Sequence, residues 1–334
     1  MKPGPIGIHL SEDRIKIAQV GEEGGKLEVI EMISLPTPKG SIASGHLKTP
    51  RIIADEIGNA INAARFSGRK AVIAIPSEIL KVAIVTLQDT QNLDNAVAAK
   101  IAQMAFEHPE EMTFDYKIIS KTREAVRTIV AITNKNHVQT IKEIVTQAKL
   151  ILLASDLEML SVFRLASFTY KTEKNPLLIC LFCGANLKLA LFTDRVLSSI
   201  KTTTLETPRA MLDPKLAGIE IGKFLEEYRH LNLLTDIPTI YLAGLPEPSF
   251  AIEKAIWETT QMKTTSLRWN SAFSLSSTYA NFSELKNRFG AYSCALGLSL
   301  SDIHLSPKAA APIFADPRQE GFRSDLLSFG ITED

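Results

Sequence analysis

Apolar positions near the start of the chain form a pattern that recurs near its middle. Residues 6–10 are an apolar run, followed by a polar turn at 11–13 and a second apolar run from Ile15. Residues 177–196 repeat this order, with a turn at 184–186. Strand-forming residues bounded by turn residues predict strand–turn–strand in both places. The two second runs read Ile-Lys-Ile-Ala and Leu-Lys-Leu-Ala. This repetition predicts two related halves.

The rest of the chain alternates between strand and helix patterns, which predicts an α/β protein. A third strand follows each pair, at 27–32 and up to about 202. A polar stretch, 170–176, separates the two halves. Further strands are predicted at 71–75, 82–87, 114–119, 126–133, 150–153 and 239–243, and helices at 50–67, 94–106, 138–148, 157–168, 215–231, 252–257 and 291–300.

Composition limits the class of protein. The 334 residues are 45% hydrophobic and 22% charged, with no net charge, so no electrostatic feature favours nucleic acid. Three cysteines do not make a disulfide framework, and no segment has the ~18 apolar residues that a membrane span needs. We expect a soluble cytoplasmic protein that reaches a membrane only through a partner.

Several short stretches follow one another in a characteristic order over residues 5–302. They are Gly7-Ile8-His9-Leu10-Ser11 with Ile15-Lys16, 67–77 ending Ile75-Pro76-Ser77, 107–109 with Phe114-Asp115-Tyr116, 154–158, 224–229, 240–244 and 295–298. Taken in this order, the stretches resemble the PilM family of type IV pilus assembly proteins and, more distantly, the cell-division protein FtsA.

The resemblance implies an actin-like fold, which is a duplicated ribonuclease H-like α/β architecture. It carries an inserted α/β subdomain in the first half and a reduced subdomain in the second. The expected first core subdomain comprises 1–40 and 150–172, and the insertion comprises 41–149. The second core subdomain is expected at 173–305, with a small insertion at 203–235. A Pro/Ala-rich tail, 306–334, is expected to be disordered.

The resemblance also implies a function. The first half, residues 1 to about 170, is expected to bind the cytoplasmic N-terminal peptide of a PilN-like inner-membrane protein. An extended peptide could lie in an apolar groove or along a strand edge. The chain would then serve as a scaffold of a pilus or related envelope machine, and the sequence leaves self-association open.

The nucleotide motifs of actin-like proteins are altered in this chain. His9 stands where the first hairpin has an aspartate, and imidazole is a poor ligand for Mg²⁺. Phe182 takes the position of the second acid, and Leu245-Pro246 follows Gly244 where a second glycine belongs. Only 203–214 separate the third strand and the next helix, where the family places base-binding residues. We therefore expect no ATP hydrolysis, no catalytic or metal-binding residues and no cofactor.

A working ATPase is the alternative hypothesis. It would bind ATP and Mg²⁺ through Ser11, Lys16, Gly184, Ala185 and Gly244, whose backbone or side chains could approach phosphate. Lys16 is either a phosphate ligand or a lysine on the solvent face of a strand, and we favour the second interpretation. A self-assembling filament component is a third class.

Other candidate residues favour structural roles. Cys180 and Cys183 have the spacing of a redox motif, but they lie in a predicted strand, on opposite faces, and we interpret them as small buried residues. His9 is interpreted as a hydrogen-bonded strand residue. Trp257 and Trp269 could belong to the core or to a partner surface.

Overall fold

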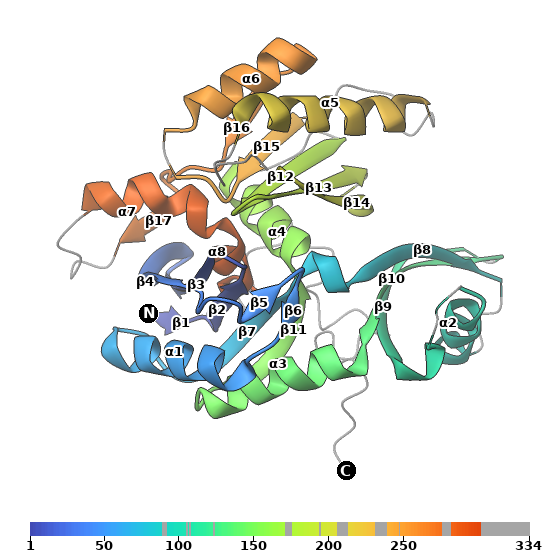
Figure 1. The fold of residues 1–334 in the computed structure, drawn as a ribbon, viewed down its shortest axis with the longest axis horizontal. Coiled ribbons are helices and arrows are strands. Elements are labelled where there is room, and N and C mark those ends of the chain that lie inside the picture. The colour runs from blue at the N-terminus through green and yellow to red at the C-terminus, as the bar shows by residue number, and fades with distance from the viewer. Residues whose placement is uncertain are drawn as a thin grey trace.

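Two large sheets form the two halves of the molecule (Figure 1). The computed structural model describes residues 1–88, 92–104, 106, 108–122, 124–170, 176–193, 195–205, 213–230, 239–246, 248–275 and 282–301. The predicted tail, 306–334, and most of the predicted linker lie outside the described residues.

The first sheet has the strand order β11-β7-β2-β3-β4-β17. Its antiparallel part is the predicted meander of β2 (Ile6–Leu10), β3 (Arg14–Glu23) and β4 (Lys26–Pro36). β7 (Lys70–Ile75) and β11 (Ile151–Leu157) continue it in parallel beyond β2. The shorter strands of this half are β1 (Lys2–Pro3) beside β3, β17 (Phe273–Leu275) beside β4, and the separate pair β5 (Ile42–Ala43) and β6 (His46–Leu47).

The second sheet repeats this layout, with the order β14-β13-β12-β15-β16. β12 (Leu177–Cys183), β13 (Asn186–Thr193) and β14 (Val196–Thr204) form an antiparallel meander. β15 (Thr239–Ala243) and β16 (Thr264–Ser266) extend it in parallel beyond β12. The two halves are therefore built alike, which confirms the duplicated architecture.

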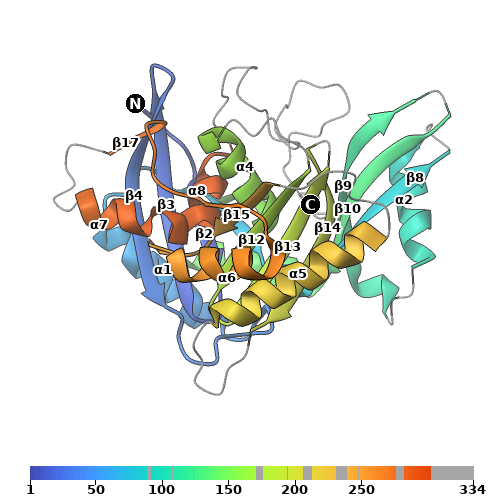
Figure 2. The same ribbon diagram turned by 90° about the horizontal axis from the view of Figure 1, so that it is seen from above.

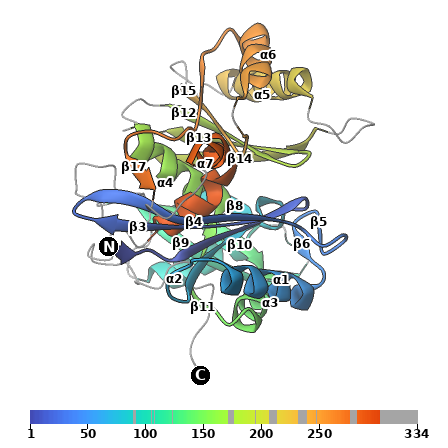
Figure 3. The ribbon, with the colours of Figure 1, turned by 90° about the vertical axis from the view of Figure 1, so that its left-hand side faces the viewer.

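Helices divide the molecule into layers (Figure 3). α4 (Glu158–Tyr170) and α8 (Ser293–Ser299) lie between the two sheets, with α7 (Phe282–Arg288) beside them. The outer face of the first sheet is covered by α1 (Pro50–Ala63) and α3 (Lys135–Gln147), and that of the second by α5 (Pro214–His230) and α6 (Phe250–Thr260). Three short 3₁₀ turns complete the described helices, at Ser77–Ile79, Pro109–Glu111 and Phe289–Tyr292.

A third, smaller sheet projects from the first half (Figure 2). Its order is β8 (Lys81–Leu87), β10 (Val126–Asn134), β9 (Met112–Lys121), and α2 (Leu93–Ala102) covers one face with a small core of its own.

This separate unit is smaller than the predicted insertion of 41–149. β7 lies within that range but pairs with β2 and β11 in the first sheet, while α1 and α3 cover that sheet. The physical reason is that every residue of β7 after Lys70 is buried, so the strand needs cover on both faces. Only about residues 81–134 form the projecting sheet.

The second half has little space for a further subdomain after its meander. β14 ends at Thr204 and α5 begins at Pro214, which leaves only residues 205–213 between them. No helix among the described residues is long and apolar enough to cross a bilayer.

The two central helices approach each other closely at Gly297. A Cβ atom at Gly297 would lie 1.9 Å from the carbonyl oxygen of Ser161 in α4. At the same contact, Arg164 of α4 donates from Nη1 to the Gly297 carbonyl at 2.7 Å and from Nη2 to Asp156 at 2.7 Å. This contact therefore joins α8 to the first turns of α4, and it depends on a residue without a side chain.

We predict that Gly297→Ala destabilises the protein by about 3 kcal/mol, because the new methyl group overlaps the backbone of α4. The matched control is Gly58→Ala in α1, where a Cβ atom would lie 3.5 Å from its nearest neighbour. The control should be neutral or stabilising by up to about 1 kcal/mol, since alanine favours a helix. Urea denaturation measures both, and equal effects would contradict the close approach.

Candidate functional site

The turns of the two meanders meet at the interface between the halves. The turn after β12 contains Gly184, whose φ of 58° lies in the left-handed region that favours glycine. A Cβ atom there would lie 3.2 Å from Cγ of Asp13, in the turn after β2. The carboxylate of Asp13 therefore lies directly against the Gly184 turn.

One buried carboxylate lies behind these turns. Glu158, the first residue of α4, has no exposed surface. It accepts hydrogen bonds from the amide and the hydroxyl of Ser77, at 2.9 and 2.6 Å. His9 Nε2 of β2 lies 2.9 Å from Oε1. Lys188 Nζ lies 2.9 Å from Oε1 and 2.7 Å from Oε2. Glu158 thus accepts hydrogen bonds from residues of both halves of the molecule.

Lys188 carries the interaction across the interface. It belongs to β13 in the second half and is 2% exposed, while both of its carboxylate partners belong to the first half. Its Nζ also lies 2.9 Å from Oε2 of Glu78. Two carboxylates therefore surround one buried ammonium, and we call Glu78, Glu158, Lys188, His9 and Ser77 the interface cluster.

The pKa values in the interface cluster favour its charged form. Burial by itself raises the pKa of the Glu158 carboxyl, but the charge of Lys188 and the hydrogen bonds from His9 and Lys188 bring the pKa well below its usual value. Burial lowers the pKa of Lys188, and the facing carboxylates raise it by more. Burial also lowers the pKa of His9, whereas contacts with Cys183 and Glu158 raise it by more, to about 9.

The predicted phosphate-binding residues are only partly brought together. The hydroxyl of Ser11 lies 2.8 Å from both Oδ1 of Asp13 and the carbonyl of Arg14, so it is engaged within its own turn. Ala185 is exposed, and its carbonyl accepts a hydrogen bond from Leu205 at 2.6 Å. Ser11 and the turn that holds Ala185 do meet at the interface.

Lys16 is not on a solvent face, so the interpretation we favoured is wrong. It is 7% exposed and pairs with His9 in the register of β2 and β3, which places both side chains on the face toward the interface.

Gly244 lies against the end of β12, close to the turn at Gly184, and has a structural reason to be glycine. Its φ is 82°, and a Cβ atom would lie 2.0 Å from the carbonyl oxygen of Phe182. Its amide donates to the carbonyl of Gly290 at 2.9 Å. This amide is therefore engaged with the protein backbone.

Two other interpretations are confirmed. His9 is a buried, hydrogen-bonded strand residue. Cys180 and Cys183 are buried free thiols that belong to different cores, Cys180 on the outer side of the second sheet and Cys183 on the interface side. The two tryptophans differ, since Trp269 packs edge-on against Phe289 whereas Trp257 is 50% exposed.

The space between the turns is too small for a nucleotide. The hollow beside the interface cluster has a volume of about 10 Å³ and is lined in part by Ser11, Glu78, Cys183 and Lys188. That volume suits one water molecule, whereas pockets for small organic ligands measure roughly 300–1,000 Å³. The residues present therefore do not fit ATP, because their own charges fill the phosphate position.

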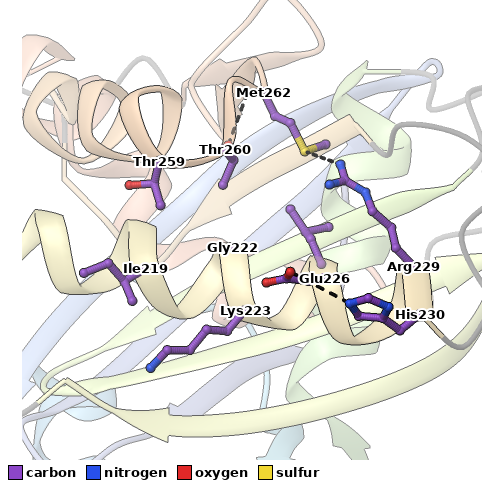
Figure 4. Close-up of a pocket in the computed structure, with 10 residues that line it drawn as sticks. Ile219, Gly222, Lys223, Glu226, Arg229, His230, Thr259, Thr260 and Met262 are labelled. Atoms are coloured by element: carbon purple, nitrogen blue, oxygen red, sulfur yellow. Dashed lines mark hydrogen bonds and ion pairs between the residues drawn. The ribbon is translucent and has the colours of Figure 1, made fainter.

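A larger hollow lies on the far side of the second sheet, between α5 and α6 (Figure 4). Its volume is about 460 Å³, and Ile219, Lys223, Arg229 and Met262 are among the residues that line it. Apolar side chains of the outer core separate it from the interface cluster. It is thus not part of the actin-like cleft.

No sequence pattern described above assigns a role to Glu78, Glu158 or Lys188. A signal for Lys188 was available, because it lies in a strand between Leu187 and Leu189 and its counterpart Lys16 has the same surroundings. A lysine at such a position needs a buried partner. No comparable pattern marks Glu78 or Glu158, since their approach depends on the packing of the two halves.

Two sheets of matching order, with α4 and α8 between them and the hairpin turns facing each other, define an actin-like protein. The family described as "Type IV pilus assembly protein PilM" matches residues 7–174. This match covers half of the chain, and the chain belongs to that family.

Solved structures agree on the fold. The chain is similar to a structure titled "PilM-PilN type IV pilus biogenesis complex", with a TM-score of 0.75 and 16% identity over 89% of this chain and 98% of that one. It is also similar to the ethanolamine utilization protein EutJ from Carboxydothermus hydrogenoformans, with a TM-score of 0.51 and 9% identity over 90% of each chain. A search of curated proteins finds no match.

We predict that Lys188→Met destabilises the protein by about 3–5 kcal/mol, because it leaves the buried Glu158 charge without its main partner. The matched control is Lys201→Met, which removes a 3.0 Å pair with Glu227 on the surface and should cost under about 1 kcal/mol. Chemical denaturation compares the two variants. Equal, small effects would show that the interface cluster does not hold the halves together.

Proposed function

We propose that this chain is a PilM-type scaffold that binds a cytoplasmic segment of a PilN-like inner-membrane protein and does not hydrolyse ATP. It would work in the cytoplasm, at the inner membrane through that partner, in a type IV pilus or a related envelope machine. The observation that carries the proposal is the interface cluster, in which Lys188 joins Glu78 and Glu158 across the cleft.

The chemistry of the cleft supports the absence of ATP turnover. The Asp13 carboxylate beside Gly184 repels phosphate, and Glu158 and Glu78 already neutralise Lys188. Phe182 at the second acid position packs in the outer core, away from the cleft. His9 offers a nitrogen ligand where Mg²⁺ prefers oxygen.

An edge of the first sheet supports peptide binding by the first half. β11 is the terminal strand of that sheet, so one of its sides has no neighbouring strand among the described residues. Ile151 at its start is 59% exposed, and Leu152 and Leu153 are partly exposed. The remaining residues of β11 are buried, so the apolar surface of this edge is limited to 151–153. Such a surface beside an unpaired edge favours the addition of an extended segment from a partner. The PilN-like segment would lie there.

The similarity to a PilM-PilN complex supports this choice of partner. That structure and this chain share the fold over nearly their whole lengths. For this chain we propose only the same class of partner, namely a membrane protein with a short cytoplasmic N-terminal segment.

For the nucleotide, we predict that Mg-ATP at millimolar concentration leaves the melting temperature unchanged. A ligand present at 100 times its Kd would add about 2.7 kcal/mol to the free energy of unfolding. Thermal-shift and calorimetric titrations measure this directly. Saturable stabilisation by Mg-ATP, accompanied by phosphate release, would contradict the scaffold proposal and support the ATPase hypothesis.

For the partner, we predict micromolar binding of the cytoplasmic N-terminal peptide of a PilN-like inner-membrane protein. Ile151→Lys should weaken binding at least tenfold, because it puts a charge on the apolar edge. The control is Ile52→Lys, which changes an isoleucine of similar exposure on α1 and should bind normally. Fluorescence anisotropy gives the affinities.

Two outcomes would contradict the predicted binding of the peptide at β11. Absence of binding at high micromolar peptide would reject the partner. Binding that Ile151→Lys leaves unchanged would reject β11 as the docking edge while keeping the partner.

A further inference from the structure

Three potential metal ligands from three elements converge at the interface. His9 Nε2 in β2 lies 2.9 Å from Oε1 of Glu158 in α4. The sulfur of Cys183, at the end of β12, lies 3.8 Å from the same nitrogen. All three ligand atoms lie within 4.8 Å of one another, and the residues are 1%, 0% and 5% exposed.

Their positions make this convergence informative. His9 stands where the resembled family has the acid of the first hairpin, and Cys183 follows the residue at the second acid position. Soft nitrogen and sulfur donors thus lie at or beside the places where oxygen donors would serve Mg²⁺. We propose that His9, Cys183 and Glu158 form a zinc site that joins the two halves of the molecule.

The ligand set selects the metal. Thiolate and imidazole favour Zn²⁺ over Mg²⁺ or Ca²⁺. Tetrahedral zinc with bonds of about 2.0–2.3 Å places nitrogen about 3.5 Å from sulfur and about 3.4 Å from oxygen. The observed pairs, at 3.8 and 2.9 Å, reach these separations with shifts of about half an ångström or less.

The neighbouring ammonium of Lys188 is compatible with this metal. Its Nζ lies 2.9 Å from Oε1 and 2.7 Å from Oε2 of Glu158, and 2.9 Å from Glu78. Zinc binding would take over the contact with Oε1, and the ammonium would keep its pairs with Oε2 and Glu78. Ser77 also donates to Oε2 through its amide and its hydroxyl. Hydrogen bonds of this kind orient a carboxylate ligand and increase metal affinity.

The charge balance also permits binding. Zinc needs Cys183 as thiolate and His9 with an unprotonated Nε2, so two protons leave when one Zn²⁺ enters. The net charge of the group is unchanged. The metal takes the place of the proton between His9 Nε2 and Glu158. The adjoining hollow of about 10 Å³, lined by Cys183, has room for a water molecule as the fourth ligand.

The test uses the full chain after treatment with a chelator. Titration with Co²⁺, which reports on zinc sites, should give a sulfur-to-metal charge-transfer band that saturates at one ion per chain. Zn²⁺ should then displace Co²⁺, release two protons and raise the melting temperature. The band needs a thiolate, so the exposed groups His108-Glu110-Glu111 and His46-His137 cannot produce it.

Cys183→Ala and His9→Gln should abolish the band and the zinc-dependent stabilisation. Cys180→Ala is the matched control, because Cys180 is on the same strand but belongs to the outer core, and it should keep both.

Absence of a charge-transfer band in the wild-type protein would overturn the proposal, whether or not the variants fold. A band that survives Cys183→Ala would overturn it as well. Neither readout involves the PilN-like partner, so failure here leaves the proposed scaffold function standing.

Discussion

The buried carboxylate of Glu158 organises the space between the two halves. It begins the central helix α4 and receives hydrogen bonds from Ser77 and Lys188, with His9 also at 2.9 Å. A buried charge of this kind is stable only when its partners surround it. Since Lys188 comes from the second half and the other partners from the first, satisfying Glu158 requires the two halves to be closed on each other. The closed arrangement therefore satisfies this electrostatic requirement, and the apolar core that both halves share lies beside it.

The same residues also determine which charges lie in the cleft. In an actin-like cleft, triphosphate and its metal bring negative and positive charge between the two hairpins, whereas here carboxylates and an ammonium of the protein supply both. The same residues cannot serve both purposes, because Lys188 is paired with Glu78 and Glu158. Membership of the family is thus compatible with a cleft whose charged groups are paired with one another. The fold supplies two joined halves, and β11 forms an edge of the first sheet.

The sequence predicted the architecture better than the site. The meanders were predictable because apolar runs and turn residues recur in both halves, as in 15–18 and 187–190. The extent of the projecting sheet was not predictable, because the apolar sequence of β7 suits a strand of the first sheet and a strand of a separate sheet equally well. Lys16 was assigned to solvent because a lone strand lysine is usually exposed. The roles of Glu78 and Glu158 depend on contacts between residues distant in the chain, which no local pattern records.

The interaction between Glu158 and Lys188 joins the two halves across the cleft, and a double-mutant cycle measures its strength. The free energies of unfolding of Glu158→Gln, Lys188→Met and the double variant would be measured by chemical denaturation and compared with the wild-type protein. We expect a coupling of at least about 2 kcal/mol, with the double variant more stable than the sum of the single effects implies. Effects that add to within about 0.5 kcal/mol would show that the two residues do not interact across the cleft.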